Sequence, residues 1–216
     1  MTDESLKEEI LINVTPSEVR AALLESGILQ EVYIERSARR GVISNIYKGR
    51  VSRVLPGMQA AFVDVGLQRT AFLHVSDIIR QQNGDSEGDE LPGIRDLVRE
   101  GEDVLVQVVK DPLGNKGARL TTFITLPSRH LVLLPKGDTV GISARIEDEA
   151  ERERLREMVT GLLDEAGLGC GAIVRTVAEG ASAEELRADL EFLVKLWSVV
   201  QERCSNAEVK SLIHED

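Results

Sequence analysis

The sequence predicts a mixed α+β fold in which strands dominate the first half of the chain and helices join them in the second. Short apolar runs alternate with polar residues and are separated by glycine and proline as far as residue 122. Two longer segments with apolar residues at helical spacing follow after residue 146. The 216 residues, 42% hydrophobic and 29% charged, suffice for one or two globular domains with apolar cores.

The first strands belong to residues 9–35. Ile10, Ile12 and Val14 alternate with polar neighbours, and further strand-like runs occupy 18–24 and 28–34. A meander of three strands cannot bury both of its faces by itself. We therefore expect these strands to need a packing partner elsewhere.

A small β-barrel is predicted for residues 41–122. Alternating runs at 43–54, 61–65, 71–75 and 104–109 are separated by turns that contain glycine or proline, a spacing typical of small barrels. The polar, acidic segment 81–93 predicts an exposed insertion, with a short helix at 94–100 behind it.

The remainder of the chain, from Phe123 onward, predicts strands at 130–134 and 172–176 and two helices. In the first helix, 147–165, apolar side chains recur at helical spacing: Leu155, Met158, Val159, Leu162 and Leu163. The second opens at Ser182-Ala-Glu-Glu, a capping box, and runs toward Arg203.

The charge is unevenly spread along the chain. With 26 basic and 37 acidic residues the net charge is −11, which argues against nonspecific nucleic-acid binding by the chain as a whole. Residues 36–72, however, hold seven basic residues against one acid, whereas 85–103 holds eight acids against two arginines and 146–165 eight against three. A polyanion would be attracted to the first segment only. The alternative interpretation is that these runs are solvated faces.

Several classes of protein are excluded by what the sequence lacks. No apolar run approaches the roughly 18 residues of a membrane span, and no signal-peptide pattern is visible, so we expect a cytoplasmic protein without a membrane partner. Cys170 and Cys204 form no Cys-x-x-Cys pair, and His74, His130 and His214 are scattered. The residues therefore encode neither a disulfide framework nor a local metal site.

The two central barrel strands each place an aromatic residue opposite the predicted core. A period of two sets Val63 and Val65 on one face and Phe62 on the other, and in the next strand it sets Leu73 opposite Phe72 and His74. Outward-facing rings beside a basic segment suit single-stranded nucleic acid, because bases stack on rings while cations contact phosphates. The alternative is that each phenylalanine caps one end of the barrel.

The segment Gly114-Asn115-Lys116-Gly117 places an ammonium at a loop tip. It is read either as a simple hairpin turn or as a phosphate contact.

Five motifs in order carry a family resemblance. They are Asn45-Ile-Tyr-Lys-Gly-Arg-Val, Pro56-Gly-Met-Gln-Ala-Ala-Phe-Val-Asp, Gly114-Asn-Lys-Gly-Ala, Leu120-Thr-Thr and Ile173-Val-Arg-Thr. The first two, with Phe72-Leu-His-Val-Ser, resemble the S-one class of OB-fold RNA-binding domains. Together the motifs resemble the amino-terminal half of the bacterial RNase E/G endoribonuclease family, with the closer likeness to its RNase G branch.

This resemblance implies a domain organisation. It assigns 1–36 to the first segment of a split RNase H-like subdomain, 37–122 to an inserted OB-fold RNA-binding domain, 123–213 to a 5′-sensor subdomain and 214–216 to the resumed RNase H-like segment. The family's magnesium-binding aspartates and its paired-cysteine zinc link, which joins protomers, would lie beyond Asp216. The resemblance thus implies an inactive fragment with no catalytic residue and no cofactor of its own, from a homo-oligomeric parent enzyme.

The implied function is that of the RNA-binding and 5′-monophosphate-sensing half of a single-strand-specific endoribonuclease for ribosomal RNA processing and mRNA decay. Its partner would be single-stranded RNA with a 5′-monophosphate end. One alternative is a free-standing OB-fold RNA-binding module. Another is a structural interaction protein that uses the acidic helix 147–165.

The resemblance also implies site residues. On the barrel they are Phe62, Phe72 and Lys116, to which the outward face and the basic segment add His74, Lys48 and Arg50. In the 5′ sensor, Arg175 and Thr176 match the pair that binds the terminal phosphate, and the positions around them are Ser128, Val132 and Arg145. A guanidinium can bridge two phosphate oxygens while a hydroxyl supplies a third donor. The alternative for Arg175 is an ion pair with a local acid such as Glu179.

Overall fold

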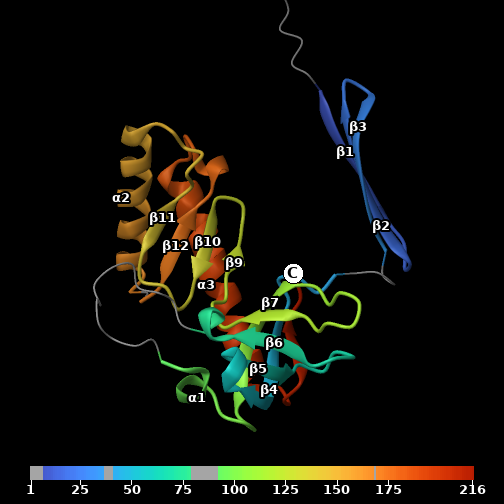
Figure 1. Ribbon diagram of the computed structural model, residues 1–216. Helices are drawn as coiled ribbons and strands as arrows, with labels where there is room; N and C mark the ends of the chain where they lie inside the picture. Colours follow the sequence, from blue (N-terminus) through green and yellow to red (C-terminus); the bar gives the residue numbers. More distant parts are fainter. Residues whose placement is uncertain (1–6, 37–40, 79–91, 168) are drawn as a thin grey trace, which may run out of the picture. The chain divides into compact units, whose positions relative to one another are not determined.

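The computed structural model describes residues 7–36, 41–78, 92–167 and 169–216. The chain divides into two compact units, Met1–Gly41 and Val42–Asp216, and each is described here by itself (Figure 1). The predicted domain boundaries within and between these units stay predictions. Most of the predicted insertion at 81–93 lies outside the described residues.

The first unit is the predicted three-stranded meander. Its antiparallel strands lie in the order β1 (Glu8–Val14), β2 (Glu18–Glu25) and β3 (Ile28–Arg36). Ile10 and Ile12 are 68% and 67% exposed, and Val32 is 52% exposed. Within the described part of this unit no helix or second sheet covers these side chains. The expectation that the meander cannot bury its own faces is therefore confirmed, whereas the RNase H-like assignment stays a prediction.

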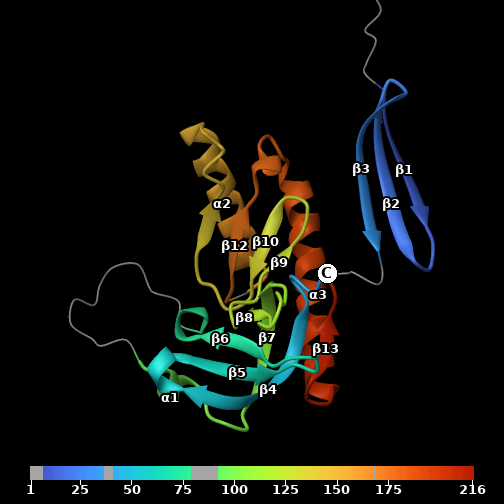
Figure 2. The same cartoon turned by 45° about the vertical axis from the view of Figure 1, so that its right-hand side comes forward.

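The second unit begins with a closed β-barrel of five strands (Figure 2). The strands are β4 (Ile46–Leu55), β5 (Ala60–Asp64), β6 (Ala71–His74), β7 (Asp103–Lys110) and β8 (Arg119–Thr121). They pair in the order β4-β5-β6-β8-β7, and pairing of β7 with β4 closes the barrel. A closed barrel in a mixed α+β chain is consistent with the predicted OB-fold.

Strand β4 closes the barrel because it is long and bent, so that it pairs with β5 along one edge and with β7 along the other. Its ten residues pair with β5 and β7, and its register shifts between Val51 and Arg53. A Cβ atom on Gly49 would lie only 2.6 Å from a methyl carbon of Val63, so glycine lets these two strands approach. The barrel core consists of aliphatic side chains from alternate positions, among them Val51, Val63, Val65, Ala71, Leu73 and Val106.

Short helical segments lie between some of the barrel strands. They are the 3-10 turns η2 (Pro56–Met58) and η3 (Val75–Asp77), and the helix α1 (Ile94–Leu97). The helix was predicted to reach residue 100, but it ends three residues earlier, and the Glu100 carboxylate instead accepts a hydrogen bond from the Val54 amide at 2.9 Å.

Beyond the barrel, a second sheet is covered by two helices. Its strands β9 (Leu126–Pro127), β10 (Leu131–Leu134), β11 (Val140–Ile142) and β12 (Gly171–Val174) lie in the order β11-β12-β10-β9. The helices α2 (Glu149–Glu165) and α3 (Ala183–Asn206) share one core with this sheet. Leu131, Leu133, Ala172 and Val174 belong to this core, so both helices cover the face that they share. Their neighbours Val132 and Ile173 lie on the open face.

The last strand was not expected. Strand β13 (Ser211–His214) pairs with β4 at the barrel, and its Ile213 joins the core of the helical layer together with Ile46. Gln107 strengthens this junction because its side-chain amide exchanges hydrogen bonds of 2.9 Å with the Thr125 backbone. The barrel and the helical layer therefore form one continuous unit.

Candidate nucleic-acid interface

A row of three rings runs across strands β5 and β6 of the barrel. Phe62 lies directly opposite Phe72 in the register of the two strands. The Phe62 and Phe72 rings are 6.2 Å apart and meet edge-on at 66°, and the Phe72 and His74 rings are 6.3 Å apart and nearly parallel at 27°. All three are only half-buried, whereas Val63, Val65 and Leu73 are fully buried. The predicted alternation of core and outward faces is confirmed; we call these three residues the ring row.

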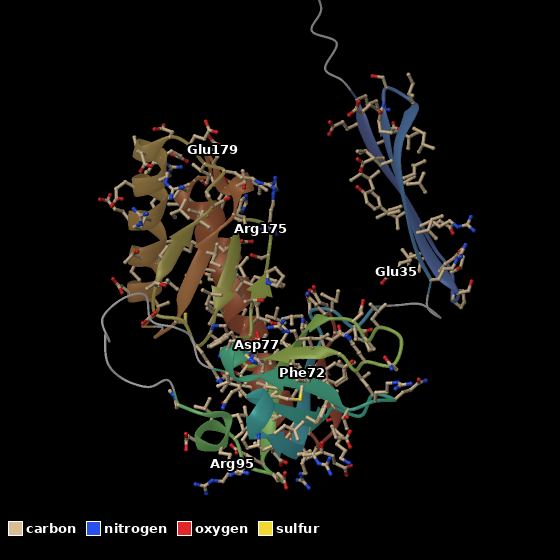
Figure 3. The ribbon with its side chains drawn as sticks, in the orientation of Figure 1. Glu35, Phe72, Asp77, Arg95, Arg175 and Glu179 are labelled. Atoms are coloured by element: carbon tan, nitrogen blue, oxygen red, sulfur yellow. The ribbon has the colours of Figure 1, made fainter. Side chains whose placement is uncertain are left out.

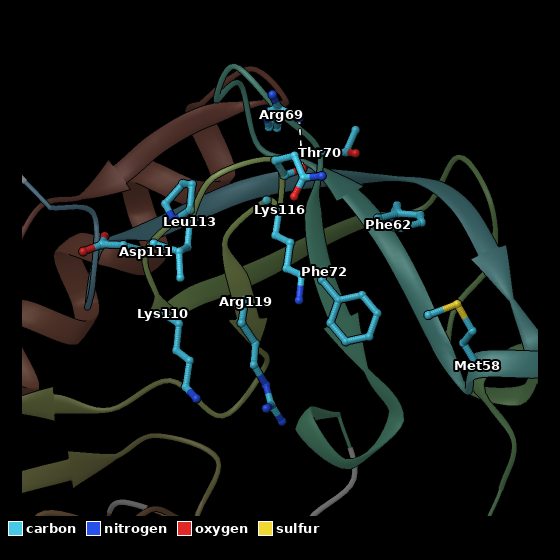
Figure 4. Close-up of a pocket in the computed structure, with 13 residues that line it drawn as sticks. Met58, Phe62, Arg69, Thr70, Phe72, Lys110, Asp111, Leu113, Lys116 and Arg119 are labelled. Carbon is cyan, nitrogen blue, oxygen red and sulfur yellow. Dashed lines mark hydrogen bonds between the residues drawn. The ribbon is translucent and has the colours of Figure 1, made fainter.

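A groove of about 940 Å³ adjoins the ring row (Figure 4). Met58, Phe62 and Phe72 line it from the side of β5 and β6, and the hairpin between β7 and β8 lines it opposite them. Four cationic side chains also line this barrel groove: Arg69, Lys110, Lys116 and Arg119. Rings and cations thus share one concave surface.

Two of these cations have no partner among the described residues. The ammonium groups of Lys110 and Lys116 take part in no hydrogen bond or ion pair there. Lys116 closes the predicted turn around Gly114 and Asn115, because its amide donates to the Leu113 carbonyl at 3.0 Å and the Leu113 amide donates to the Lys116 carbonyl at 3.2 Å. The hairpin interpretation is therefore confirmed, and it leaves the Lys116 side chain available to a ligand.

The two arginines of the groove are held in place. Both Nε and Nη2 of Arg119 lie 3.0 Å from Oδ2 of Asp77, and Nη1 of Arg69 donates to the Asn115 carbonyl at 2.9 Å. Sequence reasoning missed Lys110 and Arg119, because neither belongs to the basic segment. Their place in the groove depends on the parallel pairing of β8 with β6, which no local pattern predicts.

Lys48 and Arg50 do not line the groove. The Lys48 ammonium donates to the carbonyls of Cys204 and Ala207, at 2.9 and 3.0 Å, where α3 ends. Arg50 donates to Asp103 at 2.8 Å, and this hydrogen bond raises the pKa of Arg50 and lowers that of Asp103. A role of these two residues in RNA binding stays a prediction, and the site we describe does not use them.

A second candidate site lies where β10, β11 and β12 end. Val174, the last residue of β12, pairs with Leu131 on one side and Ile142 on the other. Arg175 and Thr176 therefore emerge between the turn Ser128–Leu131 and Ser143. The Arg175 amide donates to the His130 carbonyl at 2.8 Å, which fixes the backbone at this point.

Two hydrogen bonds join the residues of this site in pairs. Nη1 of Arg175 donates to the Ser128 carbonyl, and the hydroxyl oxygens of Thr176 and Ser143 are 2.9 Å apart. No ion pair joins Arg175 to Glu179, both of which the structure describes, so the alternative interpretation of Arg175 is not supported (Figure 3). We call Ser128, Ser143, Arg175 and Thr176 the terminal site.

Val132 and Arg145 lie at the border of the terminal site. Val132 pairs with Pro127 and Ile173 on the open face of the sheet. The Arg145 amide donates to the Ser143 hydroxyl at 3.4 Å, and its guanidinium forms no hydrogen bond or ion pair with the described residues. Their contribution to ligand binding stays a prediction.

The sequence analysis missed Ser143 and also Asp189, which holds the turn of the terminal site. Oδ2 of Asp189 accepts hydrogen bonds from the Ser128 hydroxyl and from the amides of His130 and Leu131, the latter two at 2.9 Å. Asp189 is separated from Ser128 by 61 positions and is one acid among many in α3. No sequence signal could have found it.

A carboxylate clamp supports the segment behind Thr176. Glu151 accepts hydrogen bonds from Arg154 at 2.6 Å and from the Gly180 amide at 2.8 Å, and these two contacts lower the pKa of Glu151 to about 2. Arg154 also donates to the Ala181 carbonyl at 3.1 Å. The clamp thereby attaches the 3-10 turn η4 (Thr176–Ala178) and the residues after it to α2.

The described residues contain no helix suited to cross a membrane and no cluster suited to hold a metal ion. None of the described helices is both long and apolar enough to cross a membrane. In the described ranges, no three His, Cys, Asp or Glu side chains gather in a way that could hold a metal ion.

The chain is similar in sequence to several known proteins of one family. A sequence model described as the Ribonuclease E/G family matches residues 125–216. Ribonuclease G of Haemophilus influenzae is 57% identical over 210 residues, which are 95% of this chain and 42% of that protein. Ribonuclease G of Escherichia coli K12 is 58% identical over 90% of this chain and 40% of its own length.

Ribonuclease E of Escherichia coli K12 is 40% identical over 97% of this chain and 20% of its own length. The identity to the ribonuclease G proteins is thus higher, as the motifs predicted. The chain spans about two fifths of the length of the ribonuclease G relatives. Over the part that it spans, the chain belongs to the ribonuclease E/G family.

Proposed function

We propose that this chain is the substrate-recognition part of an endoribonuclease, in which the barrel groove binds single-stranded RNA and the terminal site binds a 5′-monophosphate. The observation that carries the proposal is that Phe62 and Phe72 of the ring row share one groove with two ammonium groups that have no partner among the described residues. The membership of the chain in a family whose members are named ribonucleases supports RNA as the polyanion.

Bases would stack on Phe62 and Phe72 in the barrel groove and on His74 beside it, while phosphates contact Lys110 and Lys116. Stacking on aromatic rings accepts every base, and ammonium groups contact phosphates without reading sequence. The groove is therefore suited to hold unpaired RNA of any sequence. A duplex, whose bases are stacked on one another, would not present them to the rings.

In the terminal site, the Arg175 guanidinium would bridge two oxygens of a terminal phosphate. Nη1 is already engaged by the Ser128 carbonyl, which leaves the Nε and Nη2 donors for the ligand. The Thr176 hydroxyl, located beside Ser143, would supply a further donor. A phosphate monoester offers three terminal oxygens and up to two charges, whereas an internal diester offers two oxygens and one charge.

Cleavage itself would be the task of the parts of the family's proteins that this chain does not span. We propose that the chain by itself does not hydrolyse RNA. The family's metal would supply the means to activate water, a role that none of the carboxylates described above fulfils. In the whole protein, a homo-oligomer of the cytoplasm, recognition of a 5′-monophosphate would direct ribosomal RNA processing and mRNA decay.

The test is a fluorescence-anisotropy titration of this chain with two unstructured oligoribonucleotides that differ only in a 5′-monophosphate or a 5′-hydroxyl. We expect both to bind and the phosphorylated one to bind more tightly. Equal affinities would favour a general OB-fold RNA-binding module. The absence of binding to either would favour an interaction protein that uses the acidic helix α2.

A further inference from the structure

The turn between β9 and β10 departs from an ordinary hairpin. Ser128 donates its amide to the Leu131 carbonyl at 2.8 Å, as in a hydrogen-bonded pair of an antiparallel ladder. In such a pair both bonds are exchanged, so the Leu131 amide would donate back to the Ser128 carbonyl. Here the Leu131 amide donates to Asp189 at 2.9 Å instead.

This rerouted hydrogen bond leaves the Ser128 carbonyl for another donor. That donor is Nη1 of Arg175, which follows strand β12 on the adjoining side of β10. One arm of the guanidinium is thus fixed by a backbone oxygen that an ordinary hairpin would have used within the turn. This contact of Arg175 requires that the Leu131 amide has another acceptor in place of the Ser128 carbonyl.

Asp189 provides that acceptor from a separate element. The same oxygen, Oδ2, also accepts from the His130 amide at 2.9 Å and from the Ser128 hydroxyl, so one carboxylate holds three donors of a four-residue turn. Helix α3 carries this carboxylate and is itself anchored by the capping box of Ser182 and Glu185. The turn is therefore held by the helix and not only by its own strands.

We propose that Asp189 is a positioning residue of the terminal site. It accepts the Leu131 amide, frees the Ser128 carbonyl and so orients the Arg175 guanidinium before a phosphate arrives. Asp189 contacts no ligand, and it acts through Ser128. The inference rests on the proposed function of the terminal site.

The physical basis is preorganisation. An arginine side chain has many rotamers, and a phosphate that must order it binds more weakly than one that meets an arginine already ordered. Without the Asp189 carboxylate, the Leu131 amide can return to the Ser128 carbonyl and compete with Nη1 of Arg175. The guanidinium would then lose its fixed orientation, while the ring row of the barrel would be unchanged.

The experiment measures a preference ratio, the dissociation constant of a 5′-hydroxyl oligoribonucleotide divided by that of its 5′-monophosphate twin. We expect Asp189→Ala to lower this ratio about three- to tenfold, as for loss of part of a charged hydrogen-bond network, with the affinity for the hydroxyl ligand unchanged. Asp189→Asn keeps one acceptor oxygen and should lower the ratio by less. Glu191→Ala is the matched control, because it removes one exposed acid from the same helix and should leave the ratio unchanged.

A second arm separates positioning from mere support of the fold. If Asp189 acts through Arg175, then Asp189→Ala should not change the ratio further in an Arg175→Ala background. A purely structural role would instead lower the melting temperature and weaken both ligands alike.

The inference is overturned if folded Asp189→Ala keeps the wild-type ratio, or if the ratio falls equally with and without Arg175. If Asp189→Ala does not fold, Asp189→Asn decides in its place: a lowered ratio supports the inference and a wild-type ratio overturns it. A wild-type ratio near one would remove the proposed function and this inference together, whereas a preference that survives Asp189→Ala removes only the inference.

Discussion

The barrel groove and the terminal site are built from different kinds of contact. The groove offers half-buried rings and two ammonium groups that have no partner among the described residues, on the outer surface of a barrel. The terminal site offers a few directional donors held by backbone carbonyls and a neighbouring hydroxyl. Stacking and point charges tolerate many ligand geometries, whereas a held guanidinium requires one. We therefore expect the groove to supply general affinity for RNA and the terminal site to supply selectivity for its 5′ end.

The difference follows from where each set of residues lies on its strands. Phe62 and Phe72 lie within β5 and β6, where the period of two sets them opposite the core. Arg175 and Thr176 follow the end of β12, where the backbone leaves the sheet and its orientation depends on neighbouring turns. The proposed stacking contacts in the groove thus depend on strand alternation, and the proposed phosphate contacts in the terminal site depend on tertiary hydrogen bonds.

The largest expected effect is on stability, and it should differ between substitutions on the two faces of β6. Leu73 is fully buried in the barrel core, so we expect Leu73→Ala to lower the free energy of unfolding by about 2–5 kcal/mol. Phe72→Ala, one position away, should lower it far less because the ring is half-buried. Thermal melting of the two variants measures the difference. Equal losses would place Phe72 in the core and contradict the ring row.

The next effect concerns RNA affinity. Phe62→Ala and Phe72→Ala should each weaken binding of an unstructured oligoribonucleotide by about 1–3 kcal/mol, since each removes a stacking surface. The loss should be the same for 5′-phosphorylated and 5′-hydroxyl ligands, because the rings do not contact the end. Anisotropy titrations with both ligands check this, and Phe192→Ala, an exposed ring of α3 outside the groove, is the control. Unchanged affinity in both variants would leave the rings without a role in binding.

A smaller effect distinguishes the cations of the groove from those outside it. We expect affinity to fall with salt at a shallow logarithmic slope of about −2 to −4, at about −0.7 for each phosphate contact. Lys116→Ala should flatten the slope by nearly one contact. Arg53→Ala removes an exposed cation that does not line the groove and should leave the slope as it is. If the slope is the same for Lys116→Ala and wild type, Lys116 serves only the hairpin.

The smallest expected effect is on thermal stability at low pH, when the Glu151 carboxylate behind the terminal site is protonated. The pKa of the Glu151 carboxyl is lowered to about 2 by Arg154 and by the Gly180 amide, below its ordinary value of 4.5. The folded state therefore binds this proton less readily than the unfolded state, and the stabilisation is complete above about pH 5 and lost as pH falls toward about 2. Near neutral pH the melting temperature of wild type should exceed that of Glu151→Gln. The difference between the two melting temperatures should shrink as the pH is lowered. A gap independent of pH would mean that the carboxylate charge contributes nothing; Glu157→Gln on the same helix is the control.

Local patterns predicted the elements that carry their own signal. The meander, the core and outward faces of β5 and β6, and the capping box at Ser182 are confirmed. Strands β8, β9 and β11 were missed because two or three residues cannot show alternation. The ring row was therefore accessible from the sequence alone. The support of Arg175 by Ser128 and Asp189 was not, because these three residues come together only through tertiary packing.

The central claim, that general affinity and end selectivity reside in separate sites, is tested most directly by one four-way titration. Wild type and Arg175→Ala are each titrated at fixed salt with a 5′-monophosphate and a 5′-hydroxyl oligoribonucleotide. We expect Arg175→Ala to weaken the phosphorylated ligand by about 1.5–3 kcal/mol, the range for a charged hydrogen bond, and to leave the hydroxyl ligand unchanged. Arg175→Lys should restore only part of the loss, since it keeps the charge without the planar fork. Four equal affinities would contradict the claim.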